Sequence, residues 1–220
     1  MITLNKGLLA GAALLASFGS ASAAVQTYNQ AFGPTLTDFT TANFTIPAFT
    51  GGGTLNSVTA TLTASENAQG TLTNNSATTQ RFTFSEPGQV FLNTSSTQLG
   101  GLLVNLVSGP QSYILAAGAS AAFGPYSPSS NSAATFTSAS DLAAFTAPIS
   151  YNFQTLTGQT FVGGGGNVAA SLTTTASGTL SVIYNFTAPT PPPTGVPEPA
   201  SMALLGAGLA GLGLLRRRKA

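Results

Sequence analysis

Four carboxylates are the side chains in the middle of this 220-residue chain that could act as general acids or bases: Asp38, Glu66, Glu86 and Asp141. A glycosidase needs two such groups flanking one bond, about 5 to 9.5 Å apart. The patterns around these residues favour ordinary roles instead. Glu66 and Glu86 fall at expected turns, and Asp141 falls in the first turn of a short helix, where a negative charge is favourable. We therefore predict that the protein is not an enzyme and has no catalytic residue.

Metal and cofactor chemistry has few residues to draw on. The chain contains no His and no Cys, which removes most zinc and copper ligands, thiolate nucleophiles and every disulfide. An Asp-rich calcium loop does not occur in the sequence, and a calcium site built from Asp38 and Asp141 with backbone oxygens is the alternative left open. We expect no cofactor.

Charge is sparse between the two ends of the chain. The whole chain has a formal net charge of +1, but residues 25–188 hold four carboxylates against the single Arg81, a net charge of about −3. Because the sequence offers no basic face to follow a phosphate backbone, we expect no nucleic-acid partner. The aromatic content of 9% favours a packed domain over disorder.

Residues 1–24 have the three-part layout of a secretory signal peptide. Lys6 precedes an apolar stretch of about 12 residues, and an Ala-x-Ala cleavage step follows at Ala21 and Ala23. We expect export through the Sec machinery and cleavage by signal peptidase after Ala23 or Ala24. The alternative is an N-terminal membrane anchor, but spanning a bilayer takes about 20 apolar residues.

The C-terminal end combines a proline-rich linker, residues 189–195, with an apolar run and a basic cluster. The run Ala200–Leu215 would form a helix about 24 Å long, against a hydrocarbon core about 30 Å thick. It is therefore predicted to be a marginal transmembrane helix. The cationic cluster that follows this run consists of Arg216, Arg217, Arg218 and Lys219. By the positive-inside rule, this cluster keeps the tail in the cytoplasm, so the domain is on the opposite side of the membrane.

Residues 196–220 resemble the PEP-CTERM sorting signal of Gram-negative bacteria. The resemblance rests on the step Pro197-Glu198-Pro199, followed in order by a short apolar helix and an Arg-rich end. It implies that exosortase, an integral-membrane transpeptidase-like enzyme, recognises these three residues and releases or transfers the passenger. The prolines favour an extended, accessible segment. The alternative is a simple spacer before a permanent anchor.

Alternating apolar and polar residues predict strands throughout residues 25–188. The clearest stripe places Val58, Ala60, Leu62 and Ala64 on one face. Other stripes occur at 82–84, 90–92, 149–153, 168–172 and 180–186, with turns expected at 86–89 and 176–178. Residues 140–145 predict one or two helical turns, closed by Pro148.

This pattern predicts an all-β fold, an antiparallel β-sandwich of about eight to ten strands. The expected domain order is a signal-peptide helix, the sandwich over residues 25–188, the linker and the sorting signal with its transmembrane helix. The sandwich also resembles the choice-of-anchor E domain in the segments GTLNSVTATLTASENAQGTLTNNS, SDLAAF, GGGGN and TLSVIYNFT. Such domains are extracellular modules that precede different C-terminal anchoring signals, and the resemblance implies no particular molecular activity.

Two functions follow as expectations. The first is an exported, non-enzymatic surface or extracellular-matrix protein, held transiently by its tail, processed by exosortase and associated with exopolysaccharide. The second is a carbohydrate-binding or adhesive module with a permanent membrane anchor. Its stacking platforms would be Tyr113 and Tyr126, since Tyr151 belongs to an inward-facing stripe and is expected in the core.

Overall fold

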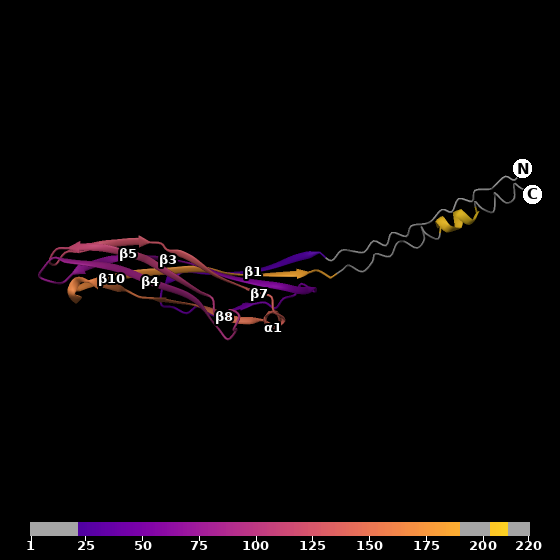
Figure 1. Ribbon diagram of the computed structural model, residues 1–220, viewed down its shortest axis with the longest axis horizontal. Coiled ribbons are helices and arrows are strands. Elements are labelled where there is room, and N and C mark those ends of the chain that lie inside the picture. Colours follow the sequence, from indigo (N-terminus) through magenta and orange to yellow (C-terminus); the bar gives the residue numbers. More distant parts are fainter. Residues whose placement is uncertain (1–21, 190–202, 211–220) are drawn as a thin grey trace, which may run out of the picture. The chain divides into compact units, whose positions relative to one another are not determined.

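β-Strands make up most of the computed structural model, which describes residues 22–189 and 203–210 (Figure 1). Within Ala23–Ala188, which form one compact unit, β-branched and aromatic residues recur at alternate positions, as a pleated strand requires. The elements in chain order are β1 (Ala23–Leu36), β2 (Phe44–Ile46), β3 (Thr54–Asn74), β4 (Gln80–Thr94), β5 (Leu103–Leu115), β6 (Ser120–Tyr126), β7 (Ser129–Phe136), α1 (Ala139–Ala144), β8 (Ile149–Thr157), β9 (Thr160–Gly163), a 3-10 turn (Gly164–Gly166) and β10 (Val168–Thr187).

The strands form two antiparallel five-stranded sheets. Sheet A has the order β1-β10-β3-β6, with β7 also paired to β3, and sheet B has the order β2-β8-β4-β5, with β9 also paired to β4. In each sheet a long strand is flanked by a second long strand on one side and by two short strands in succession on the other. The predicted all-β antiparallel sandwich is confirmed.

The predicted turn at residues 176–178 is wrong, because β10 runs through it without interruption. Its 20 residues pair with β3 along nearly their whole length, and Gly178 lies opposite Ala64. A Cβ at Gly178 would lie 2.7 Å from both the ring of Phe32 and the backbone oxygen of Thr63. The glycine therefore serves close packing rather than a change of chain direction.

The predicted turn at residues 86–89 is also wrong, since β4 is continuous from Gln80 to Thr94. Pro87 is tolerated because it lies where β8 gives way to β9: the pairing with β8 ends at Gly88, and the pairing with β9 ends at Ser85. A proline in a strand needs such a site, because it has no N–H to give to a ladder. Glu86 is consequently a mid-strand residue.

The interior contains two hydrophobic clusters. The large core cluster has twenty buried side chains and includes the predicted stripe Val58, Ala60, Leu62 and Ala64, each at most 1% exposed. Tyr151 is buried in this cluster, as predicted. The small core cluster consists of Leu72, Phe82, Phe84, Leu115 and Phe123.

Helix α1 is as short as the sequence predicts, and it begins one residue earlier. Its N-cap is Ser138, whose Oγ accepts a hydrogen bond from the Asp141 N–H at 3.2 Å. The same hydroxyl donates to Asp141 Oδ2 at 2.7 Å. Asp141 therefore lies in the first turn, as expected, where its charge favours the helix.

Residues 203–210, inside the predicted transmembrane segment, are helical and exposed. Within the two described ranges, no helix combines the length and the apolar character needed to cross a membrane. The predicted signal-peptide helix, the linker and most of the sorting signal lie outside the described residues.

Candidate functional site

A layer of polar side chains divides the two hydrophobic clusters. We define this polar layer as Glu66 on β3, Glu86 on β4, Ser108 on β5 and Thr174 on β10, each at most 5% exposed. Along each strand, the polar residue lies between residues of the large core cluster and residues that belong to the small cluster or pack against it. The two glutamates were expected at turns, and the structure instead brings them together inside the sandwich.

Hydroxyl groups from β10 and β5 lie beside the Glu86 carboxylate. Thr174 Oγ1 donates to Glu86 Oε1 at 2.5 Å, and Ser108 Oγ lies 3.5 Å from Glu86 Oε2 and 3.1 Å from the Glu86 backbone oxygen. Because Thr174 belongs to sheet A and Glu86 to sheet B, the first of these bonds joins the two sheets.

Glu66 reaches across from sheet A to the face of β4 beside Glu86. A Cβ at Gly88 would overlap Glu66 Oε2 and would lie 2.8 Å from Glu66 Cδ, so only glycine leaves room for this carboxyl group. Glu66 Oε1 is buried and has no hydrogen-bond partner. The pKa of Glu66 is raised to about 8 by burial first, then by the charge of Glu86 and the hydrogen bond with it, and last by the charge of Asp38.

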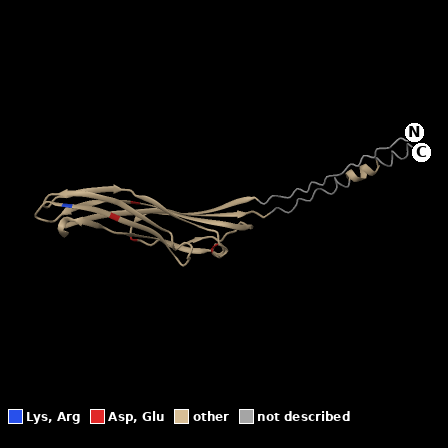
Figure 2. Cartoon of the chain, in the orientation of Figure 1, with Lys and Arg blue, Asp and Glu red and all other residues tan. Residues whose placement is uncertain are grey.

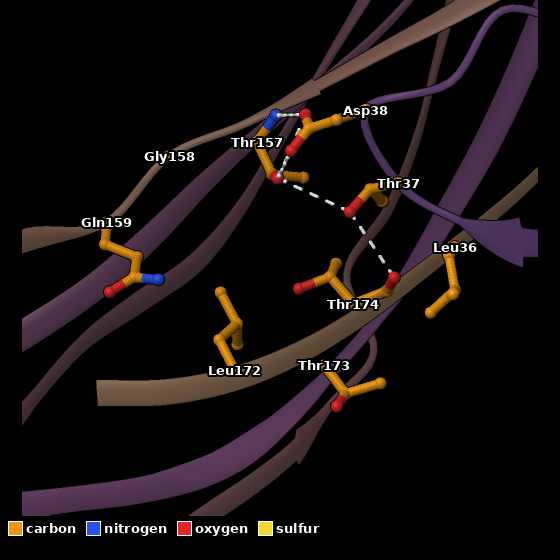
Figure 3. Close-up of a pocket in the computed structure, with 9 residues that line it drawn as sticks. All are labelled: Leu36, Thr37, Asp38, Thr157, Gly158, Gln159, Leu172, Thr173 and Thr174. Carbon is orange, nitrogen blue, oxygen red and sulfur yellow. Dashed lines mark hydrogen bonds between the residues drawn. The ribbon is translucent and has the colours of Figure 1, made fainter.

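An open pocket lies beside the polar layer, between the end of β1, the β8–β9 connection and β10 (Figure 3). Its volume is about 660 Å³. Asp38, with φ of 61°, accepts from the Thr157 N–H at 2.8 Å and from Thr157 Oγ1 at 3.1 Å. Thr37 Oγ1 lies 3.4 Å from Thr157 Oγ1 and donates to the Thr174 backbone oxygen at 3.3 Å, which links the pocket wall to the polar layer.

The wall of the pocket is more polar than apolar. The Gln159 amide and the Thr173 hydroxyl are among its lining side chains (Figure 3). Such groups match the hydroxyls of a sugar better than they match an apolar ligand. Charged residues are few along the described strands as a whole (Figure 2).

The two carboxylates considered for calcium have separate partners. Asp38 binds Thr157, whereas Asp141 Oδ1 accepts from Gln98 Nε2 at 3.2 Å. Hydrogen bonds from Ser138 and then Gln98 lower the pKa of Asp141. Within residues 22–189 and 203–210, no group of three or more His, Cys, Asp or Glu side chains is placed to hold a metal ion.

Tyr113 and Tyr126 pack together rather than standing apart on a sheet face. Their hydroxyl oxygens are 2.7 Å apart, both rings are half-buried, and both pack against the small core cluster. Tyr113 stacks on Phe82 and Tyr126 on Phe123, with ring centroids 5.6 and 6.0 Å apart. Burial first, and then the hydrogen bond to Tyr126, raises the pKa of the Tyr113 hydroxyl.

Other predicted site residues are only partly within the described ranges. Ala23 and Ala24 are the first two residues of β1, paired with Thr187 and Phe186 of β10. Ala21, together with the predicted recognition residues Pro197, Glu198 and Pro199 and the cationic cluster at residues 216–219, lies outside the described residues.

A known family identifies the C-terminal segment: residues 195–219 match the family described as PEP-CTERM protein-sorting motif. The chain carries a PEP-CTERM motif. The PEP-CTERM motif indicates an exported protein that exosortase targets, with membrane anchoring at its C-terminal end before processing. The matched range contains both the Pro-Glu-Pro step and the cationic cluster.

Solved structures and curated proteins add little to the PEP-CTERM assignment. The chain is 12%, 10% and 12% identical to chains from infectious bursal disease virus, of the Gx strain, the Gt strain and a VP2 subviral particle, with TM-scores of 0.23, 0.20 and 0.20. These alignments cover 86%, 86% and 76% of this chain but only 42%, 43% and 38% of the viral chains. TM-scores this low do not show a shared fold. No curated protein matches the chain.

Proposed function

We propose that the protein is a non-enzymatic component of the cell surface or extracellular matrix, delivered by exosortase in association with exopolysaccharide. The observation that carries this proposal is the PEP-CTERM motif at residues 195–219, behind an all-β domain that is poor in charge. In this proposal the domain is of the choice-of-anchor E type. Residues 200–215 anchor it transiently, with the cationic cluster in the cytoplasm.

The start of the domain is compatible with export through the Sec machinery and removal of residues 1–23 or 1–24 by signal peptidase. Cleavage after Ala24 would leave Val25–Leu36 of β1, and these residues include ten of the twelve that pair with β10. The sheet would therefore keep most of its edge strand in the mature protein.

The non-enzymatic part of the proposal is supported by the surroundings of the carboxylates. Glu66 and Glu86 are 4% and 1% exposed, so no substrate bond could lie between them without opening the sandwich. Both oxygens of Asp38 lie within hydrogen-bond distance of Thr157, and Asp141 is bound to the cap of α1. These contacts suit structural roles.

Mass spectrometry of the protein made by cells with exosortase tests the sorting proposal. The protein recovered from the medium or matrix should begin near Ala24 or Val25 and lack the segment beyond the Pro-Glu-Pro step. A Glu198→Ala variant should keep its tail and stay in the inner membrane, whereas Pro192→Ala, a control outside the motif, should be processed normally. An intact tail on the unmodified protein in the inner membrane would refute the proposal and support a permanent anchor.

A carbohydrate-binding module is the second candidate, and the polar pocket beside Asp38 favours it. Binding measured on a glycan array should then be lost in Gln159→Ala and retained in Tyr126→Ala. Loss of binding in Tyr126→Ala, with binding retained in Gln159→Ala, would instead indicate a binding site at Tyr113 and Tyr126. If the unmodified protein binds none of the glycans from the producing cells, the carbohydrate-binding function is refuted and the structural role is supported.

A further inference from the structure

The polar layer contains two acidic groups and no basic one. Glu66 and Glu86 come from different sheets, and the one cation within residues 22–189 and 203–210 is Arg81. Arg81 is exposed on β4 and alternates out of phase with Glu86, so its side chain lies on the outer face of sheet B. The groups that meet the carboxyl pair are neutral, apart from Asp38, which adds a further negative charge.

Two ionised carboxylates in contact inside a hydrophobic core would be strongly unfavourable. Each would pay the desolvation cost of a buried charge, and the two would repel each other with no cation to offset the repulsion. A single proton removes both difficulties, because a carboxylic acid can donate to a neighbouring carboxylate in a short, charge-assisted hydrogen bond.

We propose that Glu66 and Glu86 hold one proton between them, and that this shared proton is a pH-sensitive lock that joins the two sheets at the polar layer. In the locked state Glu66 is the acid and Glu86 the carboxylate. The lock is closed in acidic and neutral surroundings, and it is lost in alkaline surroundings, where both groups ionise.

The hydrogen-bond partners decide which glutamate carries the proton. Glu86 Oε1 accepts from the Thr174 hydroxyl at 2.5 Å, and the Ser108 hydroxyl lies 3.5 Å from Oε2, although closer to the Glu86 backbone oxygen. Glu66 has no such donors, and its Oε1 is buried without a partner, so its ionised form would be poorly stabilised. The raised pKa of Glu66 agrees with this division of roles.

The direction of the pH effect follows from linkage. Because the folded state keeps a proton that the unfolded chain releases near pH 4.5, the domain loses stability as the pH rises from about 4.5 to about 8, and the loss levels off above that range. Over this window the equilibrium constant for unfolding should rise about tenfold for each pH unit.

Urea unfolding of the full chain in mild detergent at pH 5.5, 7 and 8.5 tests the lock. Glu66→Gln keeps the shape of the side chain and an N–H donor but cannot ionise, so this pH dependence should disappear. Asp141→Asn is the matched control, because Asp141 lies in the first turn of α1, outside the polar layer, and its pKa is lowered; this variant should keep the pH dependence of the unmodified protein. Glu86→Gln removes the charge that helps to hold the proton on Glu66. The loss of stability with rising pH should therefore end at a lower pH in this variant than in the unmodified protein.

Infrared spectroscopy gives a readout that does not depend on a variant's folding yield. The folded, unmodified protein should show the carbonyl stretch of a protonated carboxyl group at pH 7 and lose it in the alkaline range. Absence of this band at pH 7, or equal slopes for the unmodified protein and Glu66→Gln, would overturn the proposal. So would stabilisation by calcium chloride that disappears in Glu66→Gln, since the pair would then hold a cation in place of the proton.

Discussion

Gly88 offers the sharpest mutational test of the polar layer. In Gly88→Ala the new methyl group would overlap Glu66 Oε2, so the buried carboxyl group must move away from Glu86. Overpacking of a tight interior costs about 1 to 3 kcal/mol. A displaced, unsatisfied polar group costs about 1 to 3 kcal/mol more. The alanine recovers about 0.5 to 1 kcal/mol, because glycine is entropically unfavourable in a strand. We therefore expect a net loss of about 1 to 5.5 kcal/mol in the free energy of unfolding.

A double-mutant cycle separates this collision from general damage to β4. In the Glu66→Ala background the methyl group at position 88 has room, so Gly88→Ala should cost at least about 1.5 kcal/mol less there than in the unmodified protein. Gly109→Ala on β5 is the matched control, because a Cβ at Gly109 has no atom within 4 Å and should leave stability nearly unchanged. The stabilities of the four proteins of the cycle and of Gly109→Ala are measured by urea unfolding at pH 6. Equal costs of Gly88→Ala in the two backgrounds would refute this account of the site.

Three further outcomes follow from named contacts. Asn74→Ala should lower the free energy of unfolding by about 2 to 4 kcal/mol in urea, because the two N–H groups of the buried amide are shared among three backbone oxygens and its Oδ1 accepts from the Ser76 N–H; a loss below about 1 kcal/mol would contradict this. Tyr126→Phe should cost about 1 kcal/mol by the same assay and should lower the alkaline pKa of Tyr113 in an absorbance titration, since the hydrogen bond with Tyr126 contributes to raising it; an unchanged titration would contradict the pairing. Ser138→Ala should cost about 1 kcal/mol in thermal unfolding through loss of the α1 cap, and it should raise the pKa of Asp141 measured by NMR; an unmoved pKa would count against the cap.

Alternation along the sequence carried more information than the turn signals did. On β10 the inward positions are even-numbered from Val168 to Phe186, and the phase does not change across residues 176–178. A real hairpin would have no reason to preserve that phase. The sequence Ala-Ser-Gly suggested a turn because glycine is common in turns, whereas here Gly178 makes room for the ring of Phe32.

The same reasoning explains why the carboxyl pair was missed. On β4 the inward positions run in phase from Phe82 to Leu92, and Glu86 and Gly88 occupy two of them. The in-phase position of Glu66 on β3 is equally visible in the sequence. What the sequence does not show is the register between sheets, which depends on long-range packing, and so the meeting of the two side chains could not be inferred. The alternating stripes of β3, β8 and β10 were predictable because burial on one face repeats every second residue.

The pairing of β1 with β10 has a mechanical consequence. Ala23 at the start of β1 lies opposite Thr187 at the end of β10, and β10 is bonded to β3 on its other side along most of its length. Tension applied to the chain beyond Ala188 therefore enters a strand that is held on both edges. Sliding such a strand out must load many parallel hydrogen bonds at once, instead of opening them singly as at a peeled edge. A tail used as a tether is thus attached to one of the most firmly held strands of the domain.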